Sequence, residues 1–119
     1  MYSKLATHSS VKGFHDSHAK TFFPNKCIEL AGDIHFNDDE TFTHNSLHGT
    51  NLAWTALHEI GHSLGLDHSH SYGAVMSPYY TSFYHPDLTD LALSTDDIRG
   101  IQALYGNNKF HFISRQTLD

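Results

Sequence analysis

The stretch HEIGHSLGLDHSH constrains the fold of this chain more than any other part of the sequence. Residues four apart lie on one face of a helix, so His58 and His62 can direct their rings at one point, with Glu59 beside them. Gly65 accepts a positive φ and allows a sharp turn, after which His68 can return toward the same point. The spacing therefore predicts a helix that stops near Gly65 and a cluster of three imidazoles.

Three neutral histidines form a ligand set that leaves the fourth position of a tetrahedral Zn²⁺ open for water, as in catalytic zinc sites. The alternative is chance, because histidine supplies 12 of the 119 residues. In a chain of this composition the pattern H-E-x-x-H-x-x-G-x-x-H arises by chance at roughly 2 in 10,000. We therefore expect His58, His62 and His68 to bind a catalytic zinc. Glu59 would be the general base for the activated water.

The remaining composition excludes several classes of protein. A length of 119 residues suffices for one domain with a modest core. The formal charge of −6 and the lack of a basic cluster argue against nucleic acid or an anionic membrane as a partner. No apolar run reaches the roughly 18 residues of a membrane span, and MYSKLATHSS is not a signal peptide. We expect a monomer whose single cysteine, Cys27, is a free thiol.

Periodicity and capping residues predict a mixture of strands and helices. A short strand is expected near residues 18–23, and alternating apolar residues predict another in AGDIHFNDDE. Thr50 or Asn51 can cap the helix that carries the histidines. Ser94 can cap a second helix that ends at Gly106 and has acidic residues in its first turn.

The histidine pattern resembles the zinc motif of the metzincins, which is followed by a Met-turn. Met76, in AVMSPYY, stands where that clan places its Met-turn, and Ser69 after the third histidine is the choice of the matrixins. The stretches GDIHFNDDE, PYY and LSTDDIRGIQALYG are also similar to matrixins, the matrix metalloproteinases. The resemblance runs from about His8 to Gly106.

This resemblance implies an α+β fold of the metzincin, zincin-like type, in which a twisted mixed sheet lies over the active-site helix and a second helix ends the domain. It makes residues 1–106 a partial catalytic domain, without the N-terminal strands and first helix usual in the family, and residues 107–119 a C-terminal tail. It also implies a secreted zinc metalloendopeptidase that acts on protein substrates of the extracellular-matrix type.

The resemblance assigns further residues to the substrate cleft. Met76 would form an apolar floor beneath the metal, unless it is an ordinary core methionine. Pro78 and Tyr80 would line the wall of the S1′ specificity pocket. Trp54 lies one helical turn before His58, where matrixins place the residue that sets the depth of this pocket. We expect a shallow pocket that prefers medium aliphatic side chains; the alternative is that Trp54 belongs only to the core.

Structural metals are a further expectation from the family. His18 and His35 match two histidines of a second, structural zinc site, and His8 can match the third. Asp33 and Glu40 match calcium ligands, although an aspartate expected between them is an asparagine here. The alternative for the acidic residues is a solvated turn.

Two other functions are compatible with the same residues. One is a truncated, non-catalytic zinc-binding remnant or decoy of a matrixin, although a pure binding site has no use for Glu59. The other is a histidine-rich metal buffer, which predicts several weak zinc sites in place of one tight site. The histidines outside the proposed ligand sets are expected at the surface: His15, His44, His48, His70, His85 and His111.

Overall fold

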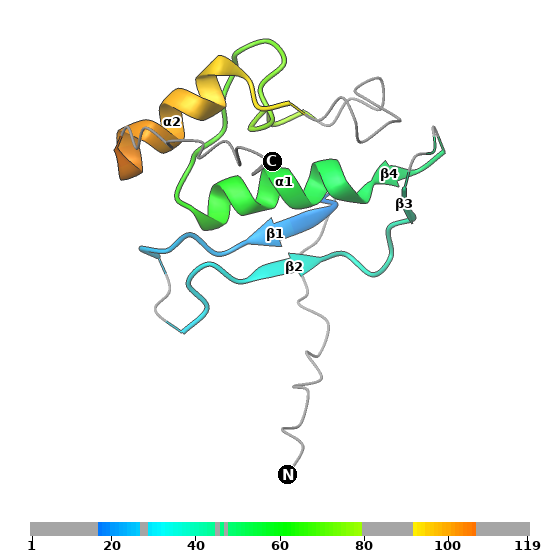
Figure 1. Cartoon of the computed structure of the whole chain (residues 1–119). Coiled ribbons are helices and arrows are strands. Elements are labelled where there is room, and N and C mark those ends of the chain that lie inside the picture. Colours follow the sequence, from blue (N-terminus) through cyan, green and yellow to red (C-terminus); the bar gives the residue numbers. More distant parts are fainter. Residues whose placement is uncertain (1–16, 27–28, 45, 47, 80–91, 107–119) are drawn as a thin grey trace, which may run out of the picture.

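The computed structural model describes residues 17–26, 29–44, 46, 48–79 and 92–106. Short strands precede two helices along the chain (Figure 1). The elements are β1 (Ala19–Thr21), β2 (Ile34–Phe36), β3 (Phe42–Thr43), β4 (Thr50–Asn51), α1 (Leu52–Ser63) and α2 (Thr95–Tyr105). This order confirms the expected α+β class.

The strands within the described residues form two ladders. Strands β1 and β2 pair antiparallel with Lys20 opposite His35, while β3 and β4 pair parallel with Phe42 opposite Thr50. Helix α1 lies along the first ladder and packs against both of its strands (Figure 1). The ladder therefore supports the helix that carries the histidine motif.

Helix α1 begins and ends where the sequence predicted. The side chain of Asn51 accepts a hydrogen bond from the backbone N–H of Trp54 at 3.1 Å, which satisfies one of the free N–H groups at the helix start. The Leu64 N–H still donates to the Ile60 carbonyl, but Gly65 follows with a φ of 99°, a conformation that glycine adopts without strain. The chain therefore leaves the helix at Gly65.

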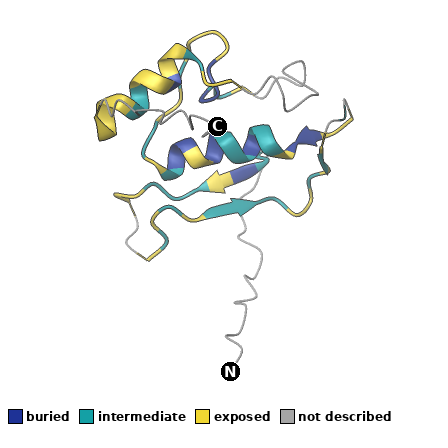
Figure 2. Ribbon diagram, viewed as in Figure 1, coloured by how far each residue is buried: buried dark blue, intermediate teal, exposed yellow. Residues whose placement is uncertain are grey.

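The buried face of α1 is polar, which is unusual for a helix packed on a sheet. Its buried residues are Thr55, His58, Glu59, Gly61 and His62, whereas Ile60 on another face is 44% exposed (Figure 2). Burial of polar groups costs free energy unless they are hydrogen-bonded or bind a ligand. The inward face of α1 is therefore organised as a site, and the small apolar core lies beside it, around Ala74 to Met76.

Helix α2 starts with the predicted cap. The Ser94 side chain accepts from the Asp97 N–H at 3.2 Å, and the Asp97 carboxylate accepts from the Ser94 N–H at 2.9 Å. This reciprocal arrangement is a capping box. The helix ends at Gly106, also as expected.

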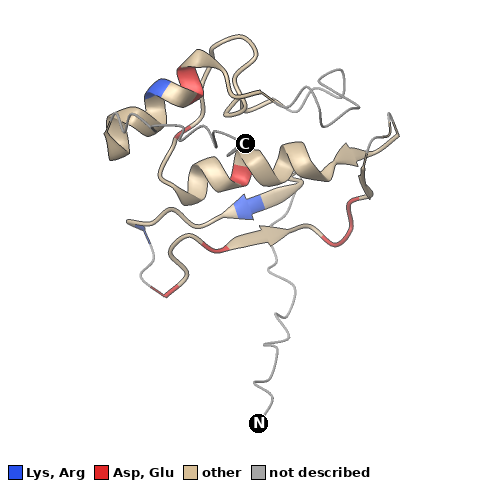
Figure 3. Ribbon diagram, viewed as in Figure 1, with Lys and Arg blue, Asp and Glu red and all other residues tan. Residues whose placement is uncertain are grey.

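Several predicted features lie outside the described residues, namely His8, Cys27, Tyr80 and the tail 107–119. No helix in the described part of the chain is long and apolar enough to cross a membrane. Over the same residues, lysine and arginine are scattered and build no basic patch (Figure 3).

Candidate metal centre

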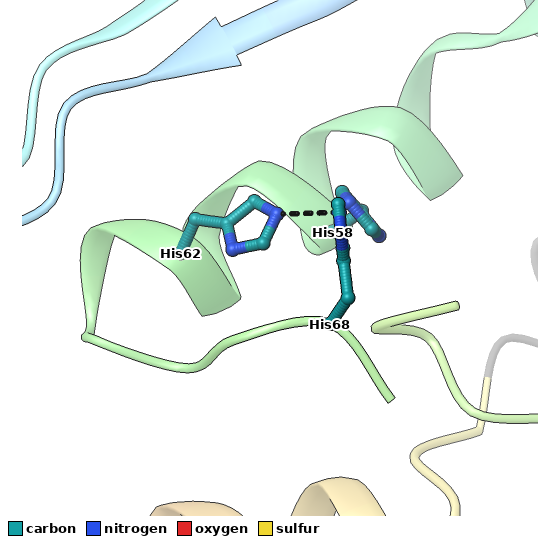
Figure 4. Close-up of side chains that lie close together, drawn as sticks. All are labelled: His58, His62 and His68. Carbon is teal, nitrogen blue, oxygen red and sulfur yellow. Dashed lines mark hydrogen bonds between the residues drawn. The ribbon is translucent and has the colours of Figure 1, made fainter. Parts of the chain in front are cut away.

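The structure brings together the three histidines whose spacing predicted a cluster. His58 and His62 come from successive turns of α1, and His68 comes from the segment after the turn at Gly65 (Figure 4). One ring nitrogen of each lies within 4.8 Å of the others, and this is the one such group of three donors found in the described residues. The two Nε2 atoms of His62 and His68 are 3.1 Å apart.

Backbone carbonyls fix the orientation of the two helical rings. His58 Nδ1 lies 2.7 Å from the Val75 carbonyl oxygen, and His62 Nδ1 lies 2.7 Å from that of Leu66. A carbonyl can only accept, so each Nδ1 carries the proton and each Nε2 presents a lone pair. Such outer hydrogen bonds orient and strengthen metal-binding imidazoles.

This donor set fits zinc. With Zn–N bonds of about 2.0–2.1 Å in a tetrahedral site, two ligand nitrogens stand about 3.3 Å apart. The 3.1 Å between the Nε2 atoms of His62 and His68 is within a few tenths of an ångström of that separation. His58 and His62 are each only 8% exposed, so little rearrangement is open to them. The residues present can therefore hold Zn²⁺ through three nitrogens.

The protonation state of the cluster also favours metal binding. Burial lowers the pKa of His58 below its ordinary value of 6.5, and the neighbouring His62 and His68 lower it further, against the hydrogen bond to Val75. His68 is exposed as a whole residue, but partial burial of its ring and the nearby His62 lower its pKa as well. Both rings are therefore neutral at pH 7, as a zinc ligand must be.

Acid should weaken the site and the fold together. Because the folded-state pKa values of His58 and His68 lie below 6.5, their contribution to folding stability is complete above that pH. It is lost as the pH falls through the lowered values. Zinc affinity should also fall below about pH 6, since protons compete for the same nitrogens. Zinc titration across pH measures this; affinity that stays constant down to about pH 4.5 would contradict a three-histidine site.

Glu59 lies inside the site and is only 6% exposed. Its charge raises the pKa values of both His58 and His68, which places its carboxylate close to the cluster. The Thr21 hydroxyl of β1 donates to Glu59 Oε2 at 2.5 Å. The role of Thr21 could not be predicted from the sequence, because a single threonine on a strand forms no motif and stands 38 positions before Glu59. The carboxylate thus belongs to the same buried part of α1 as His58 and His62.

Met76, the predicted Met-turn residue, is buried and only 3% exposed. It packs directly on the backbone of α1 at Gly61, where an added Cβ would lie 2.2 Å from the methionine sulfur. Any larger residue at this position must therefore displace Met76 or the helix. Gly61, the glycine within HEIGH, therefore has a packing role that the motif alone does not indicate.

Asp97 holds the segment that supports His58. Its carboxylate accepts from the backbone N–H groups of Val75 at 2.9 Å and Met76 at 3.2 Å, besides the Ser94 N–H and hydroxyl. Burial alone would raise the pKa of Asp97, but these hydrogen bonds outweigh burial and hold the pKa below its ordinary value. The sequence predicts Asp97 only as a favourable charge at the start of a helix. In the structure, Asp97 also joins α2 to the predicted Met-turn.

A cleft of about 350 Å³ opens beside the cluster. Trp54 forms part of its wall and stacks on the His58 ring, with centroids 5.4 Å apart and planes 19° from parallel. Pro78 lies on the wall as well, so two predicted pocket residues are next to the cluster. The other lining residues are Ser17, His18, Thr55, His58, His68, Ser77 and Tyr79.

The predicted ligands of the structural zinc and of calcium are only partly described, because His8 lies outside the described residues. The residue opposite His35 is Lys20, whose protonated ammonium offers no lone pair to a metal. His18 instead directs Nδ1 to Glu40 Oε2 at 3.2 Å, so a predicted zinc ligand and a predicted calcium ligand form one pair. Within the described residues, no group of three donors contains His18, His35, Asp33 or Glu40. The second zinc and the calcium stay predictions.

Helix α1 carries two histidines and a glutamate, and a third histidine follows a glycine turn. This arrangement, with a buried methionine nearby, resembles the zinc-binding site of the metzincins. The family model for matrixins matches residues 3–106, and the chain belongs to the matrixin family. Its fold and its histidine cluster agree with that membership.

Curated relatives share about half of the aligned residues. Human matrix metalloproteinase-15 is 47% identical over 90 residues, which are 74% of this chain and 13% of that protein. Rabbit (Oryctolagus cuniculus) macrophage metalloelastase is 50% identical over 82 residues, 69% of this chain and 17% of that protein. Mouse (Mus musculus) stromelysin-3 is 51% identical over 88 residues, 74% of this chain and 16% of that protein. The chain thus spans less than a fifth of the length of these relatives.

Proposed function

We propose that this chain is a zinc-dependent metalloendopeptidase that hydrolyses peptide bonds in extracellular proteins of the matrix type. The observation that carries the proposal is the buried Glu59 on the same helix as His58 and His62, whose Nε2 atoms present lone pairs, with His68 as the third member of the donor group. Residues 1–106 would form a partial catalytic domain and residues 107–119 a tail. The extracellular location and the monomeric state are part of the same proposal and rest on family membership.

His58, His62 and His68 would hold the catalytic zinc. When bound, Zn²⁺ supplies Lewis acidity that lowers the pKa of a water and polarises the scissile carbonyl. Glu59 takes the proton from the attacking water and delivers it to the leaving amine. Burial of Glu59 and stacking of Trp54 on His58 keep bulk water away from one side of the site. No covalent intermediate with the protein is needed.

The direct test is cleavage of a fluorogenic peptide by the purified chain, with and without a zinc chelator. A proteolytic enzyme shows cleavage that the chelator removes and added zinc restores, with one tight zinc per chain. A non-catalytic remnant or decoy would bind that one zinc and cleave nothing. A metal buffer would bind several zinc ions weakly, so the zinc stoichiometry separates it from both.

The pocket wall at Trp54 predicts substrate preference. A library of peptides that differ at the P1′ position should be cut best where that residue is a medium aliphatic side chain. Trp54→Ala should open the pocket and shift the preference toward longer side chains by about tenfold or more in kcat/KM, since a pocket discriminates roughly 10–200-fold per methylene. Leu52→Ala, on the same helix and 44% exposed, is the matched control. Best cleavage at long or aryl-extended residues by the unmodified chain would contradict a shallow pocket.

A further inference from the structure

We propose that Thr21 is a positioning residue that holds the carboxylate of Glu59 in the orientation needed for proton transfer. The inference rests on the proposed function, and it concerns a residue outside the histidine motif. Thr21 is the last residue of β1, and its hydroxyl oxygen lies 2.5 Å from Glu59 Oε2 and 3.2 Å from the Glu59 backbone oxygen.

The Thr21 hydroxyl donates its hydrogen bond to the Glu59 carboxylate and not to the Glu59 backbone carbonyl. A hydroxyl has one proton, so it donates to one acceptor at a time. Hydrogen bonds from a hydroxyl to a charged carboxylate are typically about 2.5–2.7 Å long, which matches the contact to Oε2 and not the 3.2 Å contact to the carbonyl. The contact lies where Glu59 is only 6% exposed.

Thr21 is well suited to hold the Glu59 carboxylate in one orientation. It pairs with Ile34 across the β1–β2 ladder, which fixes its backbone, and β1 packs against α1. A β-branched side chain has few χ1 rotamers, so the hydroxyl has little freedom once the backbone is fixed. The terminal torsion of a glutamate is broad by comparison. Strand β1 thus supplies the rigid side chain, Thr21, and helix α1 supplies the mobile side chain, Glu59.

As a consequence, the two carboxylate oxygens of Glu59 have different roles. Thr21 contacts Oε2, and in this proposal Oε1 is the oxygen that accepts the proton from water. Glu59 directly follows His58 on α1, and both are buried together with His62. Misplacement of a catalytic group by about 1 Å can cost up to 100-fold in rate.

The test compares Thr21→Val, which keeps the shape and removes the hydroxyl, with Thr21→Ser, which keeps the hydroxyl. On the full, zinc-loaded chain we expect Thr21→Val to lower kcat about 10- to 100-fold with KM and zinc affinity within about twofold of the unmodified chain. Thr21→Ser should recover most of the kcat. Thr43→Val, a half-buried threonine on β3, is the matched control and should leave kcat unchanged. Equal kcat for Thr21→Val and the unmodified chain would overturn the proposal.

A second measurement separates this inference from the proposed function. Thr21→Val and Glu59→Ala, alone and combined, form a double-mutant cycle in unfolding of the zinc-loaded chain. A coupling of about fivefold to tenfold in the unfolding equilibrium constant supports the contact, and additive effects overturn it. A chain that binds zinc but cleaves nothing contradicts the proposed function, while the coupling still decides whether Thr21 holds Glu59.

Discussion

Replacing Glu59 with alanine is expected to lower chelator-sensitive peptide cleavage by about 10²- to 10⁴-fold while one zinc stays bound. The three histidine nitrogens that would bind the metal do not include this side chain, so the metal site should survive. Proton transfer from water and to the leaving amine would lose the buried carboxylate of Glu59. Steady-state kinetics and metal analysis of the same preparation measure the two effects separately.

The control for this experiment is Glu29→Ala, which removes an exposed glutamate away from the site. It should leave both the rate and the zinc content unchanged. If Glu59→Ala retains full cleavage, Glu59 is not the general base, and the assignment of roles in the site is wrong. If it loses zinc as well as activity, the residue supports the ligands more than the proton transfer.

Removing the third histidine should have the second large effect. His68→Ala is expected to weaken zinc binding by more than 100-fold, beyond the roughly 10- to 100-fold lost with an outer-shell partner. His68 is the most suitable ligand to delete, because it is exposed and its removal leaves no buried cavity. Competition for zinc with a chelating dye measures the affinity, and circular dichroism confirms that the helices persist.

The matched control is His70→Ala, two residues further along the chain and also exposed. It should bind zinc as tightly as the unmodified chain, because His70 does not belong to the cluster. Equal losses for His68→Ala and His70→Ala would mean that zinc binds a diffuse set of histidines, as the metal-buffer alternative requires. Full retention of zinc by His68→Ala would leave the site without its third ligand.

The features predicted correctly from the sequence depend on short separations along the chain. The positions of His58 and His62 follow from one helical turn, and the return of His68 follows from the conformational freedom of Gly65. The cap at Ser94 also follows from neighbouring residues. Local geometry of this kind is set by the backbone, so the sequence carries it directly.

Features that depend on tertiary packing could not be predicted in the same way. The contact between Thr21 and Glu59 joins residues 38 positions apart, and no local pattern encodes it. The pairing of β1 with β2 places Lys20 opposite His35, a register that strands of three residues with no strict alternation do not specify. The arrangement of His18 with Glu40 follows from that packing and was therefore not foreseen.

The double role of Asp97 has a consequence for how this part of the molecule comes apart. One carboxylate closes the first turn of α2 and also ties down the backbone of Val75, whose carbonyl orients His58. Opening of that helix start therefore frees the His58 ring at the same moment, although α2 contributes no ligand to the cluster. We expect the start of α2 and the histidine cluster to open together, as parts of one cooperative unit.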